Sequence, residues 1–176
     1  MTILARSAIF NEIDRGNIVI DPFLPDSVGP ASVDLRLSHI FRLFKSPPDT
    51  IRVWDETDYR ATTTRLVTSD GRGLVLAPGQ TALGMTIERI RLADSICGWI
   101  DGRSRFARLG LLVHISAGFI QPGIDNHQVL ELFNFGPHPL ELVSGTKICQ
   151  FIFCRTEGQG SYALSGRFAT QCLDNF

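Results

Sequence analysis

Short apolar segments, separated by glycine and proline, fill most of this chain and constrain its fold more than any other feature. Examples are GLVLAPGQTALGMTIERIRL, ICGWIDGRS, LGLLVHIS and HQVLELFNFG. Within PASVDLRL, apolar Val33, Leu35 and Leu37 alternate with polar neighbours, which is typical of a half-buried strand. Short strands with turn signals roughly every 8–12 residues predict a mainly β fold, a sandwich or a barrel.

The remaining segments complete a one-domain prediction. A length of 176 residues with 44% hydrophobic residues suits a single packed domain. Apolar residues at helical spacing in residues 4–16, followed by Gly16, predict a short N-terminal helix. Residues 45–73 are polar and predict an excursion with weak strands. Residues 156–176 are rich in glycine and serine, and predict either a disordered tail or an arm that orders on a ligand or a neighbouring subunit.

Charge and cysteine content narrow the functional classes. A net charge of −1 indicates neither a general nucleic-acid binder nor a binder of anionic membranes. The apolar runs are shorter than the ~20 residues of a membrane span, and the N-terminus lacks a signal-peptide core, so we expect a cytoplasmic protein. The four scattered cysteines indicate free buried thiols rather than disulfides or metal ligands, and we expect no protein-bound metal.

Glu131 is an acid inside the alternating segment VLELF. Two interpretations stay open: Glu131 shares a face with Val129 and faces solvent or a site, while Leu130 and Leu132 form the core face, or the acid itself is buried. A carboxylate in such a place is suited to act as a general base.

A serine among arginines precedes Glu131 in the chain. Ser104 lies with Arg103, Arg105 and Arg108 between two glycines, a pattern that suits phosphate oxygens or, alternatively, a solvated basic loop. We expect this loop to fold back toward Glu131.

Four motifs in order, PASVDLRL, DGRSRFARLGLLVHISAGFIQPG, VLELFN and SGTKICQFIF, make the chain resemble the dCTP deaminase family of the dUTPase-like superfamily. The resemblance implies a distorted β jelly roll over residues 1–155, with an arm of residues 156–176 closing over the nucleotide. It also implies a homotrimer with active sites between subunits, Mg²⁺ bound with the triphosphate, and deamination of dCTP to dUTP and ammonia without zinc.

The resemblance also implies roles for individual residues. Glu131 would relay protons at cytosine C4, Ser104 would help to hold the attacking water, and Arg108 would stabilise the site. Backbone groups from Ile115 to Ala117 would read the base edge. The implied substrate-binding set is Arg103, Ser104, Arg105, Phe106, Ala107, Arg108, Ile115, Ala117, Gln121, Val129, Leu130, Tyr162, Arg167 and Gln171.

Three departures from the family pattern bear on activity. Arg105 stands where a second serine is usual, and Gln121 where an aspartate contacts the sugar 3′-hydroxyl. The segment Ile124–Asn126 replaces a tryptophan and a glycine. An amide at 121 cannot serve as the base that dUTPases use, which favours deamination alone. A bifunctional deaminase that also hydrolyses dUTP, and a non-catalytic nucleotide-binding homologue, are the alternatives.

Overall fold

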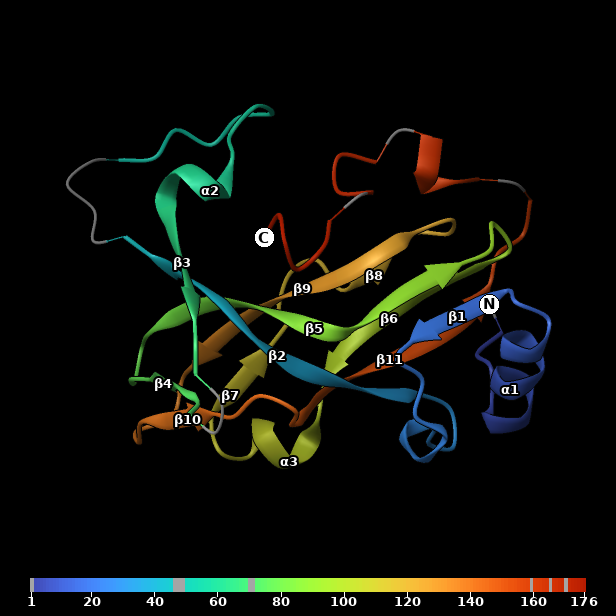
Figure 1. The fold of residues 1–176 in the computed structure, drawn as a ribbon, viewed down its shortest axis with the longest axis horizontal. Coiled ribbons are helices and arrows are strands. Elements are labelled where there is room, and N and C mark those ends of the chain that lie inside the picture. The colour runs from blue at the N-terminus through green and yellow to red at the C-terminus, as the bar shows by residue number, and fades with distance from the viewer. Residues whose placement is uncertain (1, 46–49, 70–71, 159, 165, 170) are drawn as a thin grey trace.

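A curled antiparallel sheet forms the body of the computed structural model, which describes residues 2–45, 50–69, 72–158, 160–164, 166–169 and 171–176 (Figure 1). The strands are β1 (Ile18–Asp21), β2 (Val33–Phe44), β3 (Thr63–Val67), β4 (Leu74–Leu76), β5 (Thr81–Leu92), β6 (Ile96–Gly102), β7 (Leu111–Val113), β8 (Phe119–Ile120), β9 (Asp125–Asn134), β10 (Leu140–Leu142) and β11 (Lys147–Arg155). In the described part, nine of them form one sheet in the order β7-β9-β5-β2-β11-β6-β8, with β1 beside β5 and β3 beside β2. Strands β4 and β10 form a separate pair. The prediction of a mainly β fold is confirmed.

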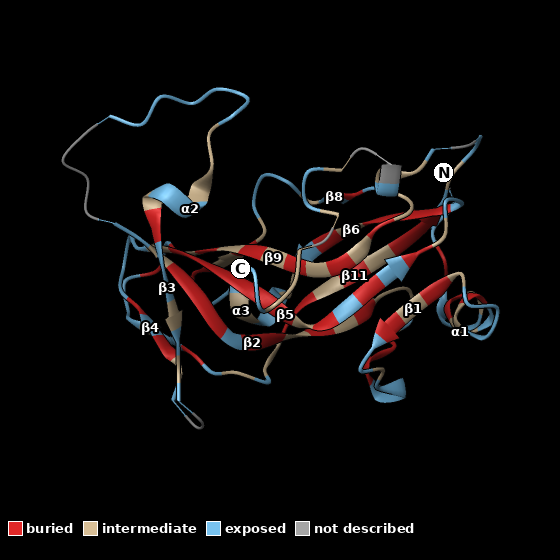
Figure 2. Cartoon of the chain, turned by 45° about the horizontal axis from the view of Figure 1, so that its top comes forward, coloured by how far each residue is buried: buried red, intermediate tan, exposed pale blue. Residues whose placement is uncertain are grey.

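The core is formed by apolar residues of the long strands, along which the buried positions gather in Figure 2. Val33, Leu35 and Leu37 of β2 are buried as their alternation predicts. On β11, Phe151 and Phe153 are fully buried, and their rings stack with centroids 4.4 Å apart. Burial of such apolar area is the main favourable term in folding, at about 25 cal/mol per Å².

The predicted N-terminal helix is present as α1 (Arg6–Asp14). It ends at Asp14, and Gly16, two residues later, has a φ of +71° and donates its N–H to the carbonyl of Ile13. Glycine adopts this left-handed conformation without the steric cost that a side chain brings, so the stop follows from the sequence.

The excursion of residues 45–73 differs in part from the prediction of weak strands. It contains β3 but also a one-turn helix, α2 (Tyr59–Thr62). The side chain of Asp58 caps this helix by accepting the N–H of Arg60 at 2.9 Å. The other short helices are η1 (Pro25–Ser27), α3 (Ser104–Ala107) and η2 (Tyr162–Leu164).

The C-terminal arm packs against the sheet of its own chain, above β8 and β9 in Figure 1. Its last residue, Phe176, is 2% exposed and lies in a small apolar cluster with Ile40, Leu83 and Met85. The guanidinium of Arg65 donates to the carbonyl of Leu173 at 3.3 Å. The described parts of the arm are therefore placed by contacts within one chain.

The predicted free thiols are present among the described residues. All four cysteines are free, and three of them are buried. No helix among the described residues is long and apolar enough to cross a membrane.

Candidate active site

Glu131 lies on β9, directly opposite Leu83 of β5. Leu130 and Leu132, its neighbours in sequence, are fully buried in the core, whereas Glu131 and Val129 are half-buried on the other face. The alternation of β9 thus resolves the two interpretations left open by the sequence. Leu130 and Leu132 form the core face, and the carboxylate of Glu131 opens into a cavity.

The carboxylate of Glu131 is held by the loop that follows β7. Its Oε2 atom accepts the backbone N–H groups of Ile115 and Ser116, each at 3.0 Å. The hydroxyl of Ser116 lies 3.2 Å from Oε1 and 3.1 Å from Oε2. These contacts fix the carboxyl group and place most of its hydrogen bonds on Oε2, so that Oε1 retains room to accept another donor.

His114 bends the loop so that both N–H groups reach the same oxygen. Its φ is +58°, a left-handed conformation that is uncommon outside glycine. Its backbone N–H donates to the carbonyl of Glu131 at 2.8 Å, and its Nε2 lies 2.9 Å from the carbonyl of Ala117. A carbonyl only accepts, so Nε2 carries a proton in this contact. Burial lowers the pKa of His114, against the opposing charge of Glu131.

The cavity beside Glu131, called here the Glu131 cavity, has a volume of about 490 Å³ and a wall that combines apolar surface with several polar side chains. This size lies within the range of about 300–1,000 Å³ that is usual for small-molecule sites. Its lining residues are Tyr59, Leu83, His114, Ala117, Phe119, Ile120, Gln121, Ile124, Asn126, Gln128, Val129, Glu131, Tyr162, Phe168 and Gln171. It brings together six residues of the predicted site: Ala117, Gln121, Val129, Glu131, Tyr162 and Gln171.

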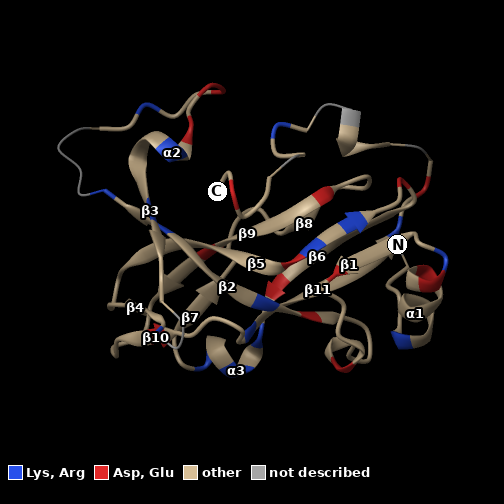
Figure 3. Ribbon diagram, viewed as in Figure 1, with Lys and Arg blue, Asp and Glu red and all other residues tan. Residues whose placement is uncertain are grey.

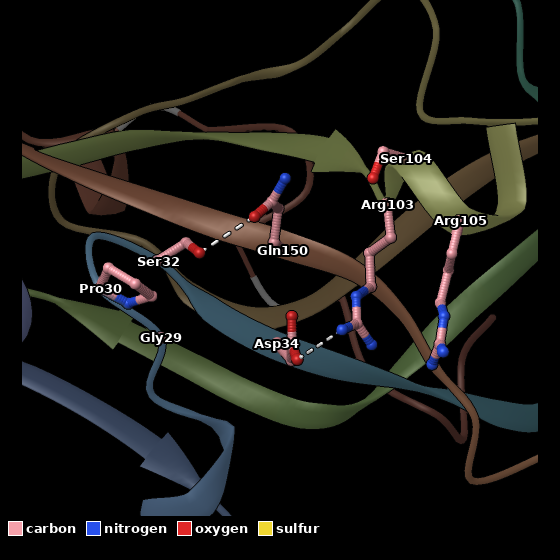
Figure 4. A pocket seen from close by; sticks show the side chains of 8 residues that line it. All are labelled: Gly29, Pro30, Ser32, Asp34, Arg103, Ser104, Arg105 and Gln150. Atoms are coloured by element: carbon pink, nitrogen blue, oxygen red, sulfur yellow. Dashed lines mark hydrogen bonds and ion pairs between the residues drawn. The ribbon is translucent and has the colours of Figure 1, made fainter. Parts of the chain in front are cut away.

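The serine and arginine loop lines a different hollow, of about 530 Å³, called here the arginine hollow (Figure 4). Its residues are Gly29, Pro30, Ser32, Asp34, Arg103, Ser104, Arg105 and Gln150. Arg103 is tied down there, because it pairs with Asp34 at 3.2 Å and donates to the carbonyl of Lys147 at 3.0 Å. Arg105 is exposed, and Figure 3 shows the positive charge gathered around α3.

The two hollows share no lining residue in the described part of the chain. The serine and arginine loop and Glu131 thus line different hollows of a single chain, although β7, which follows the loop, pairs with β9. A site between subunits, which the resemblance implies, would join the hollows, and it stays a prediction.

Several other predicted residues lie outside both hollows. Phe106 is half-buried and packs against the core. Ala107 and Arg108 are exposed at the end of α3. The predicted substrate contact of the Leu130 side chain is wrong, because this side chain is fully buried in the core and cannot contact a ligand in the cavity. The predicted reading of the base edge by the N–H of Ile115 is also corrected, because this N–H donates to the carboxylate of Glu131.

The predicted residues of the arm hold the arm in place. Arg167 donates to the carbonyls of Asp55 and Thr57, at 2.7 and 3.3 Å, and so does not reach into the Glu131 cavity. Gln171 does line the cavity, but its Nε2 donates to the carbonyl of His127 at 2.9 Å. The guanidinium of Arg167 is thus bonded to the excursion in this conformation.

Sequence reasoning missed the residues that complete the cavity wall. Tyr59 comes from the excursion and Phe168 from the arm, and their ring centroids lie 6.4 Å apart. Ser116, Asn126 and Gln128 were also missed as functional candidates. No spacing rule joins residues 59 and 168, because their approach depends on long-range packing.

The described residues contain no cluster of three His, Cys, Asp or Glu side chains that would hold a metal ion. Hard cations such as Mg²⁺ are instead often held largely by substrate phosphates and water.

Comparison with known proteins identifies the family. A family model described as dCTP deaminase-like matches residues 3–156. The "dCTP deaminase, dUMP-forming" of Nocardioides sp. is 38% identical over 156 residues, which cover 87% of this chain and 80% of that protein. The protein of the same name from Beutenbergia cavernae is 42% identical over 154 residues, covering 87% and 79%.

Among solved structures, the 2′-deoxycytidine 5′-triphosphate deaminase of Agrobacterium tumefaciens superposes with a TM-score of 0.66 at 25% identity. The match covers 88% of this chain but 48% of that chain, so this protein spans about half the length of that structure. The likeness confirms the predicted distorted jelly roll with its short N-terminal helix. On these matches, the chain belongs to the dCTP deaminase-like family.

Proposed function

We propose that this protein hydrolytically deaminates dCTP at the Glu131 cavity. The observation that carries the proposal is the carboxylate of Glu131, fixed by Ile115 and Ser116 at the wall of a cavity of nucleotide size. The relatives that match most of the chain are named as dCTP deaminases, which supports the same substrate.

Glu131 would act first as a base and then as an acid. Its carboxylate takes a proton from water as the oxygen attacks C4 of cytosine, and C4 becomes tetrahedral. Glu131 returns this proton to N3 of the ring, then takes the proton of the new C4 hydroxyl and passes it to the amino group, so that the C4–N bond breaks, the C4=O bond forms and ammonia leaves. General acid–base catalysis of this kind contributes about 10²–10⁴-fold to a rate.

The arginine hollow of a neighbouring subunit would complete the site. Ser104 is exposed at the start of α3, free to hold the attacking water, and the exposed Arg108 would supply positive charge. We propose a homotrimer for this reason, since neither residue lines the Glu131 cavity of its own chain. Mg²⁺ would enter as part of the substrate, on the triphosphate oxygens of dCTP.

The product follows from the bases that the cavity offers. Among its described lining residues, Glu131 is the single carboxylate, and residue 121 is an amide, which does not accept a proton at neutral pH. We therefore propose that dUTP is released. The second candidate is a bifunctional enzyme that goes on to dUMP and pyrophosphate, and the words "dUMP-forming" in the relatives' names favour it.

One incubation separates these proposals. Purified protein with dCTP and Mg²⁺ is expected to release ammonia and dUTP in equal amounts, with little dUMP or pyrophosphate. Pyrophosphate that keeps pace with ammonia would select the bifunctional candidate. If no ammonia is released at high enzyme concentration, both enzyme proposals are wrong, and a nucleotide-binding protein without catalysis is the remaining alternative.

Zinc independence is tested separately. Activity lost on treatment with EDTA should return on addition of Mg²⁺ alone. A requirement for added zinc would contradict a mechanism in which Glu131 activates water without a protein-bound metal.

A further inference from the structure

Two buried amide side chains at the start of β9 have no place in the chemistry above. Asn126 and Gln128 are each 6% exposed, and both line the Glu131 cavity. Asn126 also belongs to the segment that departs from the family pattern. Burying an amide is costly unless its hydrogen bonds are made, so the partners of this pair indicate what it does.

The hydrogen bonds run in one direction, from the cavity to the arm. The Nε2 of Gln128 donates to Oδ1 of Asn126 at 2.6 Å, which leaves the Nδ2 group of Asn126 directed elsewhere. That group donates to the backbone carbonyl of Phe168 at 2.9 Å. Gln128 therefore sets the orientation of the Asn126 amide, and the Nδ2 group of Asn126 donates to the arm.

The arm meets β9 at a second point beside this one. The backbone N–H of His127 donates to the carbonyl of Gln171 at 3.2 Å, and Nε2 of Gln171 donates to the carbonyl of His127. The carbonyl of Phe168 and the amide of Gln171 thus lie against consecutive residues of one strand. At the first of these points the arm presents the ring of Phe168, which lies near Tyr59 at the cavity wall.

Gln128 also faces the cavity with an acceptor. No described residue donates to its Oε1 atom. This atom is not one of the fully buried atoms, so it stays accessible. An acceptor open to the cavity can take a hydroxyl or amino donor of a bound nucleotide. A residue of the cavity and the position of the arm are then joined by one chain of hydrogen bonds.

We propose that Gln128 and Asn126 are positioning residues that couple occupancy of the Glu131 cavity to docking of the C-terminal arm. Gln128 orients Asn126, and Asn126 holds the carbonyl of Phe168. The ring of Phe168 then stays in the cavity wall when a nucleotide is bound. The inference rests on the proposed function for the identity of that nucleotide. The docking itself is independent of turnover.

Asn126→Asp is the sharpest test, because it keeps the volume and the acceptor for Gln128. It removes the donor to Phe168 and sets a carboxylate against that carbonyl. Cys172 reports docking, since it lies in the arm next to Gln171 and is the one cysteine among the four that is not buried. Its alkylation by iodoacetamide, followed by peptide mass spectrometry, is expected to be about three- to tenfold faster in the variant.

The matched control makes the same chemical change on an exposed helix. Asn11→Asp on α1 is expected to leave the labelling rate of Cys172 at the wild-type value. A nearby carboxylate disfavours a thiolate, so faster labelling in Asn126→Asp cannot be an effect of charge on Cys172. Gln128→Leu removes the donor to Asn126 and should accelerate labelling too, with the double variant no faster than Asn126→Asp alone.

Kinetics give a second readout. For dCTP, both variants are expected to raise KM about three- to tenfold with kcat changed less than KM, and dCTP should slow Cys172 labelling less than in wild type. An unchanged labelling rate in folded Asn126→Asp, or in Gln128→Leu if the first variant does not fold, would overturn the coupling. If wild type does not deaminate dCTP, the proposed function fails, and the labelling rates still decide whether the pair docks the arm.

Discussion

The backbone N–H and the hydroxyl of Ser116 both donate to the carboxylate of Glu131, over distances of 3.0 to 3.2 Å. One residue thus fixes the orientation of the proposed base through two groups, of which only the hydroxyl can be removed by substitution. Precise placement of a base matters because small displacements lower the rate of proton transfer.

Ser116→Ala is therefore expected to lower kcat for ammonia release about three- to tenfold, in keeping with the loss of one hydrogen bond to a charged group. Ser116→Thr keeps the hydroxyl and should stay close to wild type. Equal losses in the two variants would show that the hydroxyl has no part in holding Glu131.

Glu131→Gln is expected to lower kcat by about 10²-fold or more while dCTP still binds. The amide keeps the shape of the side chain and still accepts hydrogen bonds, but it does not take a proton from water. Ammonia release measures the rate and isothermal titration measures binding. Glu157→Gln, at an exposed acid, serves as the control. A near-normal rate would remove Glu131 from the role proposed for it.

The strand on which Glu131 lies was predictable because its alternation is local. Val33, Leu35 and Leu37 reveal their core face within a few residues of sequence, whereas the core face of β9 was left open until the structure showed Leu130 and Leu132 buried. The stop of α1 before Gly16 was predictable for the same reason.

The walls of the site were not predictable, because they join distant segments. Tyr59 reaches the cavity from the excursion, and Phe168 from the arm, through packing that no period in the sequence encodes. The place of Arg167 was missed because its partners are backbone carbonyls, which every residue carries. The separation of Ser104 and Glu131 into different hollows is likewise not indicated by any local pattern in the sequence.

That separation leads to a test with mixed subunits. Ser104→Ala and Glu131→Gln chains are each expected to be nearly inactive alone. Mixed in equal amounts under conditions that exchange subunits, they should regain activity, because about a quarter of the sites between subunits would pair an intact Glu131 with an intact Ser104. Ammonia release before and after exchange is the measurement. Failure to regain activity, with exchange verified by native mass spectrometry, would place both residues in the site of one chain.

Glu12 ties the N-terminal helix to the end of β11, and it gives stability a predictable pH dependence. Its side chain is fully buried, accepts Nδ2 of Asn17 at 2.6 Å, and pairs with Arg155 at 2.7 Å and Arg15 at 3.1 Å. The hydrogen bond from Asn17, followed by that from Arg155, lowers the pKa of Glu12 below its ordinary value of 4.5. A pKa that is lower in the folded than in the unfolded chain adds stability above pH 4.5, and this stability is lost as the pH falls through the folded value.

Glu12→Gln is thus expected to lower the free energy of unfolding at pH 7 by about 1–3 kcal/mol. Below pH 4.5 the difference from wild type should shrink, because Glu12 then takes up a proton in the unfolded wild-type chain before it does so in the folded one, which favours unfolding of wild type. Urea unfolding at pH 7 and pH 4 measures both values, and Asp14→Asn, on the exposed side of the same helix, is the control. A difference that stays constant between the two pH values would mean that the charge of Glu12 contributes nothing to the tie between α1 and β11.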